Sequence, residues 1–192
     1  MISEKLKSGT RHLHDLTEKK FNSSKIFEGG FDIEDYRKLL LYNYEMLSAF
    51  ENVVFSLIPD EAAADLHLEK RRKIKLAEAD MLALGANLPK VQVLSSVDCV
   101  AEAWGIFYVM EGSTLGGNMI ANQLSKLNEF KDAPFNYFRC YGPHTGSYWK
   151  TFKEVLDREI NPADEEDCLK GAENAYRFLL NLPDCSVSWF HF

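Results

Sequence analysis

Residues 97–127 read VDCVAEAWGIFYVMEGSTLGGNMIANQLSKL, and this stretch decides the fold. No proline interrupts it, and residues 101–110 are apolar on almost every face, which is typical of a helix buried on all sides. A glycine inside a helix costs about 1 kcal/mol relative to alanine. This helix nevertheless carries Gly105, Gly112, Gly116 and Gly117.

The spacing of these glycines allows two interpretations. Gly112 and Gly116 lie on one face, a turn apart, and Gly105 falls on nearly the same stripe. Such a face lets another group approach the backbone closely. The group is either a second helix packed against the glycines or a flat ligand for which they form the floor.

Length and composition indicate one globular domain over residues 1–192. Hydrophobic residues make up 46% and charged residues 27% of the chain, which is ordinary for such a domain. The net charge of −7 argues against a nucleic-acid partner. The four cysteines show no metal-binding spacing, and we see no signal peptide and no apolar run long enough for a membrane span. We therefore expect a cytoplasmic protein with reduced thiols.

Apolar periodicity and the positions of proline and glycine predict an all-α domain of about six helices, with no convincing strand. The glycine-bearing helix is one, and the others are expected at residues 2–20, 31–58, 61–84, 147–160 and 164–182. The charged run at 69–73 is interpreted as a solvated face. The aromatic loop at 130–146 is expected to pack against the body, as is the apolar C-terminal tail, SVSWFHF.

The first helix carries a polar stripe. Lys7, Arg11, His14 and Glu18 follow at steps of four, three and four, and so share one face. A single histidine on a helix is usually structural, but a neutral imidazole is also a good axial ligand for heme iron. Glu18 would then orient the ring, and Lys7 and Arg11 would pair with the heme propionates.

Other chemistries fit less well. A ferritin-like di-iron site needs Glu-x-x-His pairs, and no histidine here has a glutamate three residues before it. Cys140 and His144 are four residues apart but lack an evident third catalytic partner. No phosphate-binding loop, serine-hydrolase motif or dinucleotide fingerprint is present.

Several segments resemble the heme oxygenase family. The segment LKSGTRHLH at 6–14 is similar to the proximal-helix signature, and YVMEGSTLGG at 108–117 is similar to the distal-helix signature of the bacterial, biliverdin-producing branch. The segments at 141–152 and 175–177 resemble the same family more weakly. The likeness runs in order along nearly the whole chain, and it implies a single-domain fold with heme between the first helix and the glycine-bearing helix.

The resemblance also implies residue roles. His14 would be the proximal iron ligand, with Glu18 near it, while Lys7, Arg11 and Arg177 would face the propionates. The distal catalytic surface would consist of Gly112, Ser113, Gly116 and Gly117. Mammalian-type enzymes carry an aspartate where Ser113 stands here, which leaves the route of proton delivery open.

Three functional hypotheses follow. The first is a heme oxygenase that uses O₂ and an external electron donor (ferredoxin, flavodoxin or a reductase) to cleave heme to biliverdin, CO and ferrous iron. The second is a non-catalytic protein that binds or senses heme. The third is the same scaffold with another small ligand. A distal helix with glycines and no histidine suits the first, because a strong distal acid would favour peroxidase-like chemistry.

Overall fold

The computed structural model describes residues 1–89 and 96–183, which form nine α-helices and no strand. The helices are α1 (Ile2–Gly9), α2 (Arg11–Lys20), α3 (Lys25–Glu28), α4 (Ile33–Leu57), α5 (Asp60–Leu66), α6 (Ile74–Ala83), α7 (Val100–Leu124), α8 (Thr145–Glu159) and α9 (Glu165–Asn181). The expected all-α class is confirmed. No helix in this part of the chain is long and apolar enough to cross a membrane.

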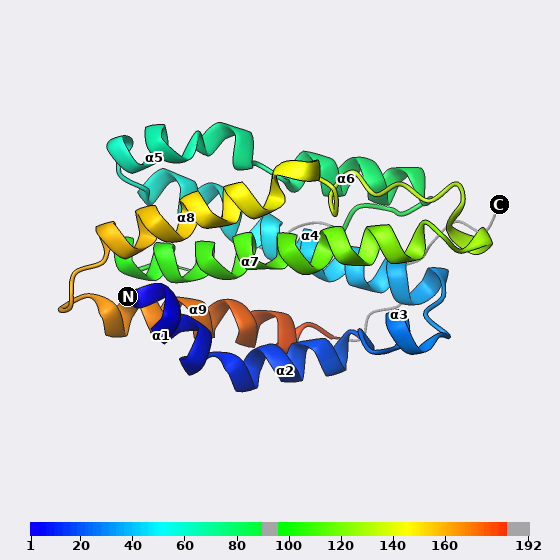
Figure 1. Ribbon diagram of the computed structural model, residues 1–192, viewed down its shortest axis with the longest axis horizontal. Coiled ribbons are helices and arrows are strands. Elements are labelled where there is room, and N and C mark those ends of the chain that lie inside the picture. Colours follow the sequence, from blue (N-terminus) through cyan, green and yellow to red (C-terminus); the bar gives the residue numbers. More distant parts are fainter. Residues whose placement is uncertain (90–95, 184–192) are drawn as a thin grey trace.

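The glycine-bearing helix α7 is the centre of the fold. Figure 1 shows it running through the middle of the molecule, with α4 behind it, α8 above it, and α9 and α2 below it. Its most extensive contact is with α9. A Cβ at Gly105 would lie 1.9 Å from the carbonyl oxygen of Cys168, and one at Gly171 would lie 2.1 Å from that of Glu102. Glycine therefore allows α7 and α9 to pack backbone to backbone at this crossing.

The single helix expected at residues 2–20 is in fact two, because the chain bends at Thr10. This residue has φ −98° and ψ 3°, outside the helical range, and its hydroxyl donates to the carbonyl oxygen of Leu6 at 2.8 Å. A threonine hydroxyl that bonds to the preceding turn competes with the regular helix and often bends it. The bend separates α1 from α2, so the polar stripe is shared by two helices.

The single helix expected at 61–84 is also wrong, because the chain leaves the helix between α5 and α6. The charged run at 69–73 is a solvated face only in part, since Arg71 and Lys73 are buried. His67 adopts a left-handed conformation (φ 50°), and a short 3₁₀ helix, η1 (Leu68–Arg71), follows it before α6 begins. Arg72 is extended, so its neighbours on either side, Arg71 and Lys73, turn inward while Arg72 itself stays exposed. Helical periodicity gave the wrong exposure for Arg71 and Lys73, because the backbone of this run is not α-helical.

The two buried cations meet one buried carboxylate. Arg71 pairs with Oε2 of Glu111, the residue before Gly112, and Lys73 Nζ lies 2.5 Å from Oε1 of the same carboxylate. Tyr141 donates a third hydrogen bond to this carboxylate at 2.8 Å. All four side chains are buried. This cluster ties α7 to η1 and to the loop that precedes α8.

That loop packs against the body, as its aromatic residues predicted. Phe135, Tyr137, Phe138 and Tyr141 are all buried. Asp80 of α6 anchors the segment, because its carboxylate accepts hydrogen bonds from the backbone N–H of Tyr137 at 2.9 Å and from the side chain of Asn136 at 2.6 Å. The apolar tail expected to pack at the C-terminus lies outside the described residues.

Candidate functional site

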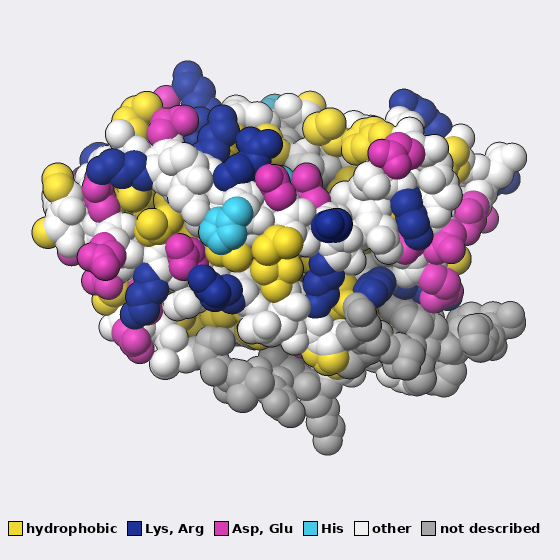
Figure 2. All heavy atoms as spheres, turned by 90° about the horizontal axis from the view of Figure 1, so that it is seen from below, with side chains coloured by type: hydrophobic (Ala, Val, Ile, Leu, Met, Phe, Trp, Pro, Cys, Tyr) yellow, Lys and Arg dark blue, Asp and Glu magenta, His cyan; other side chains and the backbone are white. Residues whose placement is uncertain are grey.

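A cavity of about 450 Å³ lies between α2 and α7, and helices α1, α4, α8 and α9 complete its walls. This volume is in the range of sites that hold a small molecule. Figure 2 views the molecule from the α2 side, where a histidine and hydrophobic side chains lie near the middle of the face, with both basic and acidic side chains around them. An apolar cavity with cations near its mouth suits a flat, largely apolar ligand that carries acidic groups.

His14 of α2 lines this cavity and is half-exposed. Its Nδ1 lies 3.6 Å from the carboxylate of Asp15, and its Nε2 lies 3.9 Å from that of Glu18. Both distances exceed a hydrogen bond. The ring also packs at nearly a right angle to that of Tyr176 on α9, with 6.2 Å between the ring centroids. Whichever ring nitrogen binds a ligand, a carboxylate stands near the other, and Asp15 is a partner that sequence reasoning missed.

Gly112 and Gly116 of α7 line the same cavity, together with Ser113 and Gly117. A Cβ at Gly116 would meet nothing within 4 Å, and one at Gly112 would make only ordinary contact with Trp149, at 3.7 Å. A Cβ at Gly117, in contrast, would lie 2.8 Å from the ring of Phe138. Packing thus explains Gly105 and Gly117, whereas Gly112 and Gly116 leave open backbone that faces the cavity.

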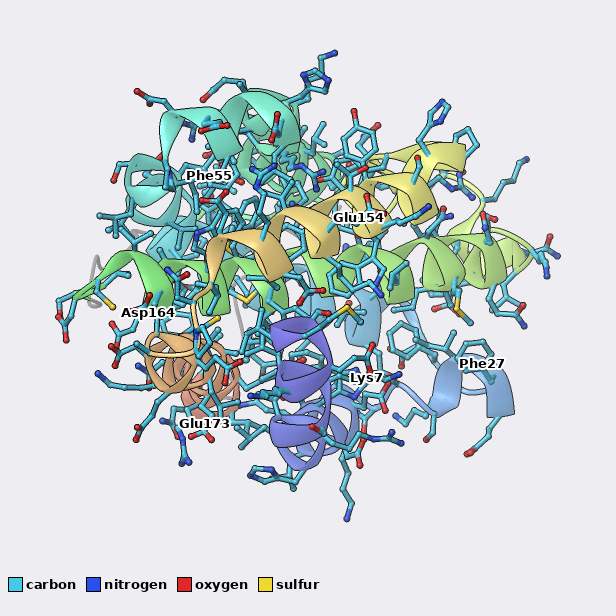
Figure 3. All side chains as sticks on the ribbon, turned by 60° about the vertical axis from the view of Figure 1, so that its left-hand side comes forward. Lys7, Phe27, Phe55, Glu154, Asp164 and Glu173 are labelled. Carbon is cyan, nitrogen blue, oxygen red and sulfur yellow. The ribbon has the colours of Figure 1, made fainter. Side chains whose placement is uncertain are left out.

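The expected cations divide into two groups. Lys7 of α1 and Arg11 of α2 line the cavity, and Figure 3 shows Lys7 on α1, below α7. Arg177 is exposed and absent from the lining, and its guanidinium lies 3.4 Å from the carboxylate of Glu173. In Figure 3, Glu173 is on the side of α9 that faces away from α7. The structure does not bring Arg177 to the cavity.

Other lining residues escaped the sequence analysis. Tyr176, next to Arg177, reaches the cavity from α9, and Lys153 and Trp149 reach it from α8. Burial of the Tyr176 phenol raises its pKa. The buried stripe of α9 could have identified Tyr176, because it stands four residues after Ala172 and three before Leu179. The same stripe places Arg177 about 100° away, on the outer face.

A row of neighbouring hydroxyl and amide groups reaches the cavity lining at Ser113. The Ser113 hydroxyl lies 2.9 Å from the carbonyl oxygen of Met110 and 3.4 Å from the phenol oxygen of Tyr137. The phenol donates to the side-chain oxygen of Asn43 at 2.8 Å. Asn43 of α4 also lines the cavity, and burial raises the pKa of the Tyr137 phenol.

Three comparisons agree with this architecture. The sequence model of the family described as Heme oxygenase matches residues 1–182. A heme oxygenase of Xanthomonas campestris pv. campestris (strain 8004) is 26% identical over 147 residues, which cover 76% of this chain and 87% of that protein.

Two solved structures share the fold. The NO- and CO-bound heme oxygenase from Neisseria meningitidis has a TM-score of 0.67 and 21% identity, with 94% of this chain and 88% of that one covered. Heme oxygenase-1 from the cyanobacterium Synechocystis sp. PCC6803, in complex with heme, has a TM-score of 0.69 and 17% identity, with 93% and 89% covered.

The fold and the cavity define an all-α protein with a cavity between its first helices and a central glycine-bearing helix. The chain belongs to the heme oxygenase family. It is accordingly an oxidoreductase that binds heme and converts it to biliverdin, and neither a heme sensor without turnover nor a scaffold for another ligand is favoured.

Proposed function

We propose that heme binds in the cavity between α2 and α7 with His14 as its axial ligand, and that O₂ and an external electron donor drive its cleavage to biliverdin, CO and ferrous iron. One observation carries the proposal: the half-exposed imidazole of His14 and the open glycine face of Gly112 and Gly116 line the same cavity. An imidazole is a suitable ligand for heme iron. The glycine face leaves room beside the ligand, because no side chain occupies it.

The residues around the cavity fit heme in size and in charge. Its apolar walls suit a porphyrin, and the ammonium and guanidinium groups of Lys7, Arg11 and Lys153 suit propionates. We assign the third cationic position to Lys153 rather than Arg177, since only Lys153 lines the cavity. Bound heme supplies the iron at which O₂ is reduced. The chain's own residues hold heme, orient it and shape the space on its distal side.

The proximal side has a carboxylate at each ring nitrogen of His14, Asp15 near Nδ1 and Glu18 near Nε2. A carboxylate that accepts the free N–H of a metal-binding histidine fixes the ring and raises its basicity. Either carboxylate could accept this N–H after a small side-chain rotation, because both lie within 1 Å of hydrogen-bond range.

The electrons come from a redox partner protein in this proposal, because the sequence shows no flavin or nicotinamide motif. We place the protein in the cytoplasm on the evidence of its thiols. Cys99, Cys140 and Cys168 are all free, which is typical of a reducing compartment.

Replacement of His14 by alanine tests the assignment. We expect the purified protein to bind ferric heme one to one and to form biliverdin when it is incubated aerobically with a reductant. His14→Ala should lose the histidine-ligated absorption spectrum and stop turnover. His12→Ala is the matched control, since His12 is exposed on the same helix and does not line the cavity. An unchanged spectrum and full activity in His14→Ala would refute the proposal.

A further inference from the structure

The two carboxylates beside His14 do not fix the orientation of its ring. Asp15 lies 3.6 Å from Nδ1 and Glu18 lies 3.9 Å from Nε2, and both distances are longer than a hydrogen bond. All three side chains are at least half exposed, so water competes for both carboxylates. A histidine that binds a metal is normally oriented by a neighbouring group that fixes its ring. The orientation of the His14 ring therefore depends on another contact.

Tyr176 of α9 provides such a contact. Its ring packs at 79° to the imidazole of His14, with 6.2 Å between the two ring centroids. Aromatic rings favour a near-perpendicular arrangement at this separation. Tyr176 is only 9% exposed and lines the cavity. A large buried ring beside a half-exposed imidazole restricts the directions in which the plane of the imidazole can turn.

The packing of α9 against α7 fixes the position of Tyr176. Gly171, five residues before it, lies where the two helices meet backbone to backbone, and a Cβ there would be 2.1 Å from the carbonyl oxygen of Glu102. Ala172 and Ala175 are fully buried in the same stripe of α9. Closely packed interiors have few voids into which an element can shift. The Tyr176 ring thus keeps its place relative to α7, the helix on the opposite side of the cavity.

The helix that carries His14 is held by fewer buried side chains. Only Leu13 and Thr17 are buried among the ten residues of α2, and the helix starts after the bend at Thr10. Its most extensive contact with another helix is with α9. Elements with few buried contacts are the ones that move most easily. The contact with Tyr176 therefore links the imidazole to a more firmly packed part of the fold.

We propose that Tyr176 is a positioning residue that sets the direction of the His14 ring plane relative to bound heme. The inference rests on the proposed heme site. The plane of an axial imidazole decides along which axis of the porphyrin its electrons are donated to the iron. A fixed plane therefore gives bound heme a single electronic structure, and the protein tunes the iron through the surroundings of its axial ligand. The ring of Tyr176 is the part that acts, since the packing does not involve its hydroxyl.

Tyr176→Leu tests the contact in the heme-free protein, and Tyr176→Phe and Phe178→Leu are its controls. Tyr176→Phe keeps the ring, and Phe178 lies on the same helix but packs on Phe50 and does not line the cavity. The proton NMR signals of the His14 ring report the contact, because a nearby aromatic ring shifts them. We expect these signals to move in Tyr176→Leu and to stay nearly unchanged in both controls. Absence of a nuclear Overhauser contact between the two rings in the wild-type protein would refute the inference without any variant.

The cyanide complex of ferric heme provides a second readout, because the chemical shifts of the heme methyl groups depend on the direction of the axial imidazole plane. Tyr176→Leu should change the pattern of these shifts, whereas Tyr176→Phe and Phe178→Leu should keep the wild-type pattern. If Tyr176→Leu binds heme through His14 and keeps the wild-type pattern, the inference is wrong while the heme site stands. If the wild-type protein binds no heme, the proposed function itself fails.

Discussion

Gly105 and Gly116 belong to one helix, yet a methyl group at each position would meet different surroundings. At Gly116 the added Cβ contacts nothing within 4 Å, and at Gly105 it would lie 1.9 Å from the carbonyl oxygen of Cys168. Helix propensity favours alanine at both positions. Packing opposes alanine only at Gly105, so the two substitutions separate the roles that the sequence left open.

We predict that Gly116→Ala stabilises the heme-free protein by up to about 1 kcal/mol, because it gains helix propensity without a clash. Gly105→Ala should lower stability strongly, since α7 and α9 must move apart. Urea unfolding of both variants measures these effects. With heme, Gly116→Ala should form less biliverdin, because its methyl group enters the cavity. A destabilised Gly116→Ala with normal turnover would contradict the role of Gly116 as a ligand floor.

The cavity cations give a graded prediction for heme affinity. Lys7→Ala, Arg11→Ala and Lys153→Ala should each weaken heme binding by up to about fivefold, the range of a largely exposed charge pair. Arg177→Ala should have no effect, since its guanidinium faces Glu173 outside the cavity. Titration of each variant with heme measures the affinity. A larger loss in Arg177→Ala than in Lys7→Ala would reverse our assignment.

At the scale of elements, the buried carboxylate of Glu111 joins α7 to η1 and to the loop before α8. It is the only carboxylate that the structure shows paired with Arg71 and Lys73 among the described residues. Removing one partner of a buried ion pair leaves uncompensated charge in a site of low polarity. The cluster thus anchors α7 through Glu111, which does not line the cavity that Gly112 and Gly116 face.

We predict that Glu111→Gln loses about 3–5 kcal/mol of unfolding free energy, because two buried cations lose their counter-charge. Glu154→Gln is a suitable control. Glu154 lies on the exposed face of α8, 3.8 Å from Lys150, and its loss should change little. Denaturant unfolding of the heme-free proteins makes the comparison. Equal stability of the two variants would show that the buried cluster makes no net contribution to the free energy of unfolding.

At the scale of the whole molecule, a ligand in the cavity would contact helices from distant parts of the sequence at once. Its walls come from α1, α2, α4, α7, α8 and α9, so heme would bridge both ends of the described chain. A ligand that binds only the folded state stabilises it in proportion to its affinity and concentration. Heme should therefore raise the stability of the entire fold.

At a free heme concentration 100-fold above Kd, we predict a gain of about 2.7 kcal/mol, which corresponds to a rise of roughly 5–10 °C in Tm for a domain of this size. Thermal melts with and without heme measure the gain. His14→Ala should show a smaller rise, because it retains the cavity and loses the axial ligand. An equal rise in both proteins would place heme elsewhere.

The sequence by itself determined the features that depend on local pattern. Helix periodicity located α4, α7, α8 and α9. Asp32 caps α4, and its carboxylate accepts from the N–H of Asp35 at 2.9 Å. The steps between Lys7, Arg11 and His14 placed them on one side of the chain, and all three line the cavity. Such features follow from residues within a few turns of one another.

Only the tertiary structure decided which distant groups meet. Sequence periodicity assigned Arg71 and Lys73 to solvent, whereas the left-handed turn at His67 and the carboxylate of Glu111 bury them. Sequence periodicity also failed to distinguish Gly105 from Gly116. The backbone of α9 lies against Gly105, whereas a Cβ at Gly116 would meet open space. The contact of Tyr137 with Ser113 has the same origin. These outcomes depend on distances across the fold, for which a single sequence carries no local signal.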